Sequence, residues 1–169
     1  MRGMKIYKNL RIFTMDENFT WYPNGYLKIY QGKIEAVGDC RELTAQELAG
    51  CEVTDGGGRI CIPGMVTTHA HFYGQFARGM LLKEPICNWQ QVLSRMWWKF
   101  DKKLTDDMTY YSAMMGLIEG LKYGTTTYYD HQASAYATEG SLDLIESAVR
   151  HAGARACLAY EVSDRDGIE

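Results

Sequence analysis

The sequence predicts an α/β fold in two parts, a small antiparallel β-sheet over residues 1–62 and parallel β-α-β units over residues 63–169. Residues 1–62 contain short runs of alternating apolar and polar residues separated by turn signals, which is typical of antiparallel strands. Residues 63–169 alternate strand-like runs with helix-length segments, which is typical of parallel strands joined by helices. We therefore expect functional groups at the carboxyl ends of the later strands.

The first part begins with the strand-like run KIYKNLRIFT and continues with YLKIYQ and KIEAVGD. We expect turns at the pairs Asn24-Gly25 and Gln31-Gly32, because glycine preceded by a polar residue favours hairpin turns. The segment RELTAQELAG predicts a short helix that ends at Gly50. Three consecutive glycines follow in EVTDGGGRICIPG and permit a sharp entry into the next element, so we place the domain boundary near residue 63.

Three strands are predicted in the second part, in the segments GMVTTHAH, TTTYYDH and RACLAYEVS. A first helix is expected over NWQQVLSRMWWKFDKKL. The clearest helix covers residues 106–123, with Thr105 as N-cap and Gly124 just past its end. A third helix opens at Ser141 and is closed by Gly153. The apolar face of the clearest helix consists, at helical spacing, of Tyr111, Met114, Met115, Ile118 and Leu121.

Two histidines, His69 and His71, lie one residue apart at the end of the first of these strands. Side chains alternate along a strand, so residues i and i+2 share a face and both imidazoles leave the strand in one direction. Imidazole is a common ligand of divalent metals, but a catalytic zinc takes three protein ligands plus a water. The pair therefore predicts part of a metal site. Asp130 and His131 end the second strand at the same edge.

The composition favours a globular protein with small-molecule partners. A chain of 169 residues with 46% hydrophobic residues can bury a sizeable core. The net charge of −3 and the lack of any run of more than two Lys or Arg residues argue against a nucleic-acid partner. No signal-like or membrane-length apolar run occurs, so we expect a cytoplasmic protein without membrane contact. The five cysteines form no C-x-x-C pair and are expected to be free thiols.

The motif PGMVTTHAH, after a small N-terminal sheet, resembles the amidohydrolase superfamily, where it marks the first strand of a metal-bearing (β/α)8 barrel. GLIEGLKYGTTTYYDH resembles the second unit of the branch that holds chlorohydrolases, guanine deaminase and cytosine deaminase. Within that branch, MWWKFDKKLTDDMTYYSAMM and LAYEVSDRDG are similar to the aminohydrolases called SsnA. The resemblance covers nearly the whole chain. It implies a partial β-sandwich over residues 1–62 and three units of an incomplete TIM-type barrel over residues 63–169.

The resemblance also implies a metal-dependent hydrolase that deaminates or dechlorinates a purine, pyrimidine or triazine-like ring. His69 and His71 would hold part of a divalent metal site, with zinc as the expected ion and iron as the alternative. Two further histidines, an Asp and a Glu proton shuttle are implied but are not in this chain. We therefore expect the N-terminal portion of such an enzyme, inactive alone and with no assigned catalytic residue.

A noncatalytic fragment, or one subunit of a split enzyme that acts as an assembly module, stays open as an alternative. An open strand edge and an incomplete helix layer would favour self-association or binding of a complementing C-terminal portion.

Three residues are candidates for binding a heterocyclic substrate: Gln75, Trp89 and His131. The Gln75 amide can donate and accept hydrogen bonds at a ring edge, although a solvated loop residue is the alternative. His131 either contacts substrate or supports a metal ligand, and otherwise packs. Arg78 has the same two alternatives as Gln75. We expect Trp97 and Trp98 to pack in the protein, and Asp130 and His151 to be structural. The roles of Glu161 and of Asp164 to Asp166 stay open.

Overall fold

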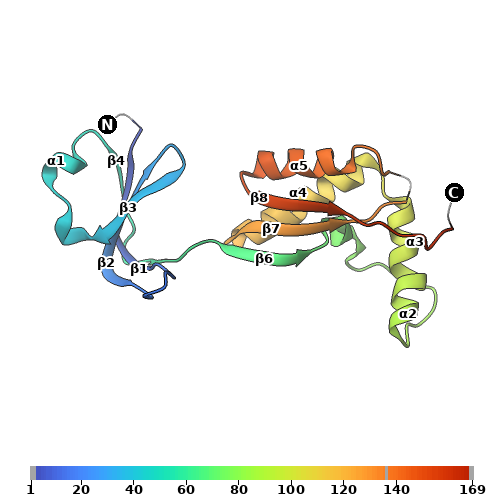
Figure 1. Ribbon diagram of the computed structural model, residues 1–169. Coiled ribbons are helices and arrows are strands. Elements are labelled where there is room, and N and C mark those ends of the chain that lie inside the picture. The colour runs from blue at the N-terminus through green and yellow to red at the C-terminus, as the bar shows by residue number, and fades with distance from the viewer. Residues whose placement is uncertain (1–2, 136, 168–169) are drawn as a thin grey trace. The chain divides into compact units, whose positions relative to one another are not determined.

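The computed structural model describes residues 3–135 and 137–167 and divides into two compact units, Met1–Pro63 and Gly64–Glu169 (Figure 1). The first unit contains a mixed five-stranded sheet. The second contains a three-stranded parallel sheet with two longer helices, α4 (Asp106–Lys122) and α5 (Ser141–Ala152).

The sheet of the first unit is mixed: its first three strands pair antiparallel, and its last two strands pair in parallel with the first. In it, β1 (Lys5–Phe13), β2 (Trp21–Tyr30) and β3 (Lys33–Asp39) form an antiparallel series with β2 in the middle. Both β4 (Glu52–Asp55) and β5 (Ile60–Cys61) pair in parallel with β1, so the sheet is not purely antiparallel. Its buried side chains are Ile6, Leu10, Ile12 and Tyr26.

The predicted turn at Asn24-Gly25 is wrong, because this pair lies inside β2. A Cβ atom on Gly25 would lie 2.7 Å from Cδ1 of Ile12, so glycine is required there for the close approach of β1. The chain turns earlier, over residues 14–20, where the Asp16 carboxylate accepts backbone N–H hydrogen bonds within the loop. The pair Gln31-Gly32 does join β2 to β3.

The helix predicted to end at Gly50 is short. It consists of a 3-10 turn, η1 (Cys40–Glu42), and the single helical turn α1 (Ala45–Leu48). The start of α1 has a capping box, in which Thr44 and Glu47 hydrogen-bond to each other's backbone N–H groups.

The second unit contains the predicted β-α-β pattern. Its strands β6 (Met65–Ala70), β7 (Thr125–Gln132) and β8 (Arg155–Tyr160) are parallel and adjacent in that order. α4 lies between β6 and β7 in the chain, and α5 between β7 and β8. All three strands therefore end at one edge of the sheet (Figure 1).

The segment between β6 and α4 is a series of short helical turns. These are η2 (Phe72–Ala77), α2 (Trp89–Val92), the π-helical turn η3 (Leu93–Trp97), α3 (Trp98–Phe100) and η4 (Asp101–Lys103). The helix predicted here exists but is irregular, since its hydrogen-bond pattern widens in the middle and tightens at the end. Within the described ranges, no helix is long and apolar enough to cross a membrane.

The core of the second unit forms where α4 packs against α5 and β7, and its buried residues are Phe72, Ala113, Leu117, Tyr128, Ile145, Ala148 and Val149. α4 contributes Ala113 and Leu117 to this core, and two of its glycines allow neighbouring side chains to approach closely. A Cβ on Gly116 would lie 2.7 Å from Phe72 Cδ1, and a Cβ on Gly120 would lie 1.9 Å from the Tyr128 hydroxyl. Close helix packing therefore depends on the absence of side chains at both glycines.

Four of the five apolar α4 residues predicted to form its buried face lie outside this core. Of the face predicted from helical spacing, Met114 packs against the core. The other four residues are between 37% and 57% exposed: Tyr111, Met115, Ile118 and Leu121. The helical period was predicted correctly, but it does not mark the side of α4 that is buried in this unit.

Candidate metal and substrate site

His69 and His71 meet at the carboxyl end of β6. His69 is in the strand and His71 follows one residue after its end, so residues i and i+2 put both side chains on the same side. The two imidazole rings are 4.8 Å apart between centroids, and their Nε2 atoms are 2.9 Å apart. The structure therefore brings together the two nitrogens that the sequence selected as metal ligands.

The hydrogen bonds of His71 indicate which of its ring nitrogens carries the proton. Nδ1 of His71 lies 3.1 Å from the backbone carbonyl oxygen of His131, and a carbonyl only accepts. The proton therefore belongs on Nδ1, which leaves the lone pair of Nε2 directed toward His69. Burial is the main cause that lowers the pKa of His71, so the ring is neutral near pH 7, as a metal ligand must be.

The donor geometry fits one divalent metal ion. Two imidazole nitrogens that bind the same tetrahedral zinc at ~2.0–2.1 Å lie roughly 3.3 Å apart, so the 2.9 Å between the two Nε2 atoms needs to widen by only a few tenths of an ångström to admit the ion. A backbone carbonyl that fixes the other ring nitrogen is also typical of metal-binding histidines. In the described part of the chain, however, no group of three or more His, Cys, Asp or Glu side chains converges to hold a metal.

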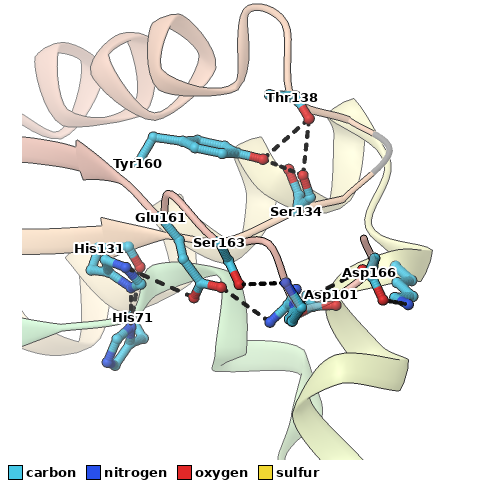
Figure 2. A network of polar contacts seen from close by, with 11 residues as sticks. His71, Asp101, His131, Ser134, Thr138, Tyr160, Glu161, Ser163 and Asp166 are labelled. Carbon is cyan, nitrogen blue, oxygen red and sulfur yellow. Dashed lines mark hydrogen bonds and ion pairs between the residues drawn. The ribbon is translucent and has the colours of Figure 1, made fainter. Parts of the chain in front are cut away.

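His131, at the end of β7, lies beside this pair. Its ring packs edge-on against His71 with 5.2 Å between centroids, and its Nδ1 is 3.3 Å from Nδ1 of His71. On the opposite side, Nε2 of His131 is 3.9 Å from a carboxylate oxygen of Glu161, just past β8 (Figure 2). His131 thus connects the imidazole pair to the polar residues that follow β8.

Asp130 connects β7 to η2, the helical turn that follows β6. It is 3% exposed, and its Oδ1 accepts a hydrogen bond of 2.7 Å from the backbone N–H of Phe72. Its Oδ2 is buried and has no partner within the described residues. Burial raises the pKa of Asp130 to about 7, against the opposing effect of its backbone hydrogen bonds. The contact supports the structural role predicted for this residue.

A cavity of about 390 Å³ adjoins the imidazoles, and its lining combines aromatic and charged side chains. The lining includes His69, His71, Tyr73, Trp89, Leu93, Trp97, Trp98, Asp101, His131, Glu161 and Arg165. Trp89 is 69% exposed, whereas Trp97 packs edge-on against Tyr73 and Phe100. The cavity therefore includes Trp89 and His131, two of the three residues predicted to bind substrate.

Gln75 does not line this cavity. It lies in η2 with its Cγ beside α4, at 3.4 Å from the position that a Cβ on Gly116 would take. Its role in binding a substrate stays a prediction. Arg78 is exposed at the end of η2, and His151 is on α5, where its Nδ1 contacts the Tyr110 hydroxyl at 3.1 Å.

Two further charged residues reach the cavity: Asp101, which the sequence analysis did not select, and Arg165, which lies in the segment 164–166 whose role it left open. Arg165, after β8, forms an ion pair of 2.6 Å with Asp101 of η4, which is 1% exposed. Arg165 also lies 3.1 Å from Glu161. The only sequence signal was the DRDG segment after a strand, because Asp101 and Arg165 are 64 residues apart in the chain.

Comparison with known proteins gives deaminases as relatives, although no family model matches the chain. The chain is 33% identical over 132 residues to a 5'-deoxyadenosine deaminase of Methanocaldococcus jannaschii, and the matched residues cover 78% of this chain and 28% of that protein. It is 31% identical over 159 residues to a 5-methylthioadenosine/S-adenosylhomocysteine deaminase of Halothermothrix orenii, and this match covers 94% of this chain and 35% of that protein. The chain thus spans about a third of the length of these relatives.

Solved structures agree on the fold. Atrazine chlorohydrolase TrzN from Arthrobacter aurescens, in a complex with zinc and atraton, is 26% identical with a TM-score of 0.75, covering 92% of this chain and 35% of that chain. Guanine deaminase from E. coli has a TM-score of 0.74 at 18% identity, and the match covers 99% of this chain and 38% of that chain. At this identity it supports the fold alone.

Parallel β-α-β units after a small sheet, with two imidazoles at the end of the first parallel strand, are the architecture of the N-terminal part of a (β/α)8 barrel. The homologues of this chain are deaminases of the amidohydrolase superfamily, and the chain corresponds to their N-terminal portion. The resemblance found in the sequence is thus confirmed at the level of the superfamily and its deaminase and chlorohydrolase members. The similarity to SsnA aminohydrolases stays a prediction.

Proposed function

We propose that the full-length protein is a metal-dependent aminohydrolase that removes an amino group from a heterocyclic ring by hydrolysis. The observation that carries this proposal is the convergence of the His69 and His71 Nε2 atoms at 2.9 Å, with the His71 proton held on its other nitrogen. The deaminase relatives support the same reaction class.

His69 and His71 would hold a divalent ion, together with ligands from outside this chain. When bound, the ion would lower the pKa of a water molecule and so supply the nucleophile. Zinc is the proposed ion, by analogy with the zinc in the chlorohydrolase complex, and iron is the alternative. The contribution of this chain is to orient the two imidazoles.

The cavity beside the imidazoles is suited to a flat ring. Trp89 provides an exposed aromatic face, and His131 provides a ring nitrogen that can donate or accept a hydrogen bond. We propose purine, pyrimidine and triazine-like rings as the substrate class, with Trp89 and His131 as contacts. The adenosine-derived substrates in the names of the relatives favour a purine.

The experiment that tests this function replaces each imidazole in the full-length protein. His69→Ala and His71→Ala should each lower the bound zinc or iron measured by mass spectrometry and abolish deamination, with the circular dichroism spectrum retained. The matched control is His151→Ala, which removes an imidazole on α5 and should keep both metal and activity. A His69 or His71 variant with full metal content and full activity would remove that residue from the site.

A second candidate function is an assembly module without activity of its own. The observation that favours it is the donor count, since no more than two metal-binding side chains converge in the described part of the chain. We therefore expect no turnover of guanine, cytosine or a chlorotriazine by the purified 169-residue chain. Mixing it with a separately expressed C-terminal portion should restore turnover if the two pieces complement each other.

A further inference from the structure

A chain of polar contacts leads from the imidazole pair to a buried carboxylate. Its last member is Asp101, whose Oδ2 accepts a hydrogen bond of 2.6 Å from Nη2 of Arg165 (Figure 2). The Arg165 side chain is 14% exposed and lies over the Trp98 ring, with 5.7 Å from Cζ to the ring centroid. Asp101 and Trp98 thus fix the guanidinium in place from two directions.

Arg165 acts on its neighbours and is not free to bind an anion. Besides Asp101, its guanidinium lies 3.1 Å from Glu161 and 3.8 Å from Asp166. Three carboxylates therefore surround one cation, with Lys102 paired to the outermost of them, Asp166. Because the guanidinium is a planar fork, it holds one Glu161 oxygen in a defined position.

The other Glu161 oxygen faces His131. It lies 3.9 Å from Nε2 of His131, an ion-pair distance at which a negative charge favours the tautomer with the proton on Nε2. In that tautomer Nδ1 of His131 has a lone pair, and it faces Nδ1 of His71 at 3.3 Å. The proton on His71 Nδ1 then has two acceptors, the His131 carbonyl oxygen and His131 Nδ1.

We propose that Glu161, held by Arg165, is a positioning residue that sets the tautomer of His131, whose Nδ1 lone pair then adds to the backbone carbonyl in holding the His71 proton on Nδ1 and the His71 Nε2 lone pair toward the metal. This inference rests on the proposed function, because it assumes that His71 is a metal ligand. The series runs from Asp101 through Arg165, Glu161 and His131 to His71. Carboxylates usually orient metal-bound histidines directly, whereas here one imidazole and one carboxylate act in sequence.

The first test reads the tautomers in the unsubstituted protein. Long-range ¹H–¹⁵N spectra of the metal-free full-length protein, labelled with ¹⁵N-histidine, report which ring nitrogen of each histidine carries the proton. We expect His131 protonated on Nε2 and His71 on Nδ1, with the signals assigned through His131→Asn and His71→Asn. A His131 ring protonated on Nδ1 in the unsubstituted protein would overturn the proposal.

The second test removes the charge of Glu161 without changing its shape. Glu161→Gln should mix the His131 tautomers and weaken zinc affinity about 10-fold in competition with a chromogenic chelator. The matched control is Glu146→Gln, which breaks the exposed ion pair with Arg150 on α5 and should leave both readouts unchanged. Arg165→Lys keeps the charge but loses the fork, so we expect a smaller loss of affinity with the same change in tautomers.

The outcomes separate this inference from the proposed function. If His69→Ala and His71→Ala do not lower metal content, the proposed function fails, whatever Glu161 does. If those variants lose metal while Glu161→Gln matches the Glu146→Gln control in affinity and tautomers, the positioning role alone is overturned.

Discussion

Asp130 shows how the fold changes the chemistry of a single residue at the edge of the site. Its carboxyl is buried at the end of β7, and burial raises its pKa from 3.8 to about 7. The folded state therefore binds this proton more tightly than the unfolded state does. The stability that the bound proton contributes is fully present below the unfolded pKa and is lost as the pH rises through the folded pKa.

We predict that Asp130→Asn, which keeps an acceptor for the Phe72 N–H but cannot ionise, removes this pH dependence. The difference in the free energy of unfolding between the variant and the unsubstituted protein should shift by about 1–3 kcal/mol in favour of the variant as the pH rises from 5 to 8. Urea titrations of chelator-treated full-length protein at the two pH values measure the change. Asp164→Asn, at an exposed position after β8, is the control and should give parallel stability profiles.

The sequence identified His69 and His71 because spacing alone puts them on one side of a strand end. It could not identify the pairing of Asp101 with Arg165, since no local pattern relates two residues that are 64 positions apart. Glu161 was placed at the correct edge of the sheet, but its contacts depend on side-chain directions in a loop, which residue spacing does not determine.

At the scale of the secondary-structure elements, the packing of α4 depends on glycines that helix propensity disfavours. Gly120 lies against Tyr128, whose hydroxyl donates to the Thr125 carbonyl at 3.2 Å. Alanine at this position would gain ~1 kcal/mol in helix propensity but would place its Cβ 1.9 Å from that hydroxyl. The steric conflict is the larger effect, because the neighbouring atoms are buried and well packed.

We predict that Gly120→Ala lowers the free energy of unfolding by about 1–3 kcal/mol, as measured by urea denaturation. The cause can be isolated by a double-mutant cycle with Tyr128→Phe, which removes the hydroxyl in conflict. Gly120→Ala should cost less in the Tyr128→Phe background than in the unsubstituted protein. Equal costs in both backgrounds would mean that the hydroxyl does not determine the packing distance.

The order and type of the elements in the second unit could be predicted because each has a clear period and a clear cap. Thr105 accepts from the Met108 N–H at 3.3 Å at the start of α4, and Gly153 adopts a left-handed conformation at the end of α5. The errors arose where tertiary contact overrides local pattern. The Asn24-Gly25 pair reads as a turn, yet it is a strand position that the β1 side chain of Ile12 restricts to glycine.

At the scale of the whole molecule, the second unit has apolar surface that its own residues do not cover. On α4, Tyr111, Met115 and Ile118 are exposed by 57%, 43% and 41%. On β6, which pairs within the described sheet with β7 alone, Met65 and Val66 are exposed by 48% and 53%. Apolar surface of this kind next to an unpaired strand edge favours association.

We predict that the isolated 169-residue chain self-associates, or binds a complementing C-terminal portion, in dilute buffer. Sedimentation velocity should show species larger than the 19.2 kDa monomer. The pair of substitutions Met115→Lys and Ile118→Glu should shift the chain toward monomer, whereas a matched pair at exposed polar sites, Asp107→Lys and Lys122→Glu, should not. A sharp monomer with cooperative unfolding would mean that the chain closes its own core.

The central claim is that His69 and His71 jointly bind one divalent metal through their Nε2 atoms. The most direct measurement is a crystal structure of the zinc-loaded full-length protein with data collected on both sides of the zinc absorption edge. We predict an anomalous peak ~2.0–2.1 Å from both Nε2 atoms, with His71 Nδ1 still directed at the His131 carbonyl oxygen. A zinc peak that contacts neither imidazole, or that lies on Nδ1 of His71, would contradict the claim.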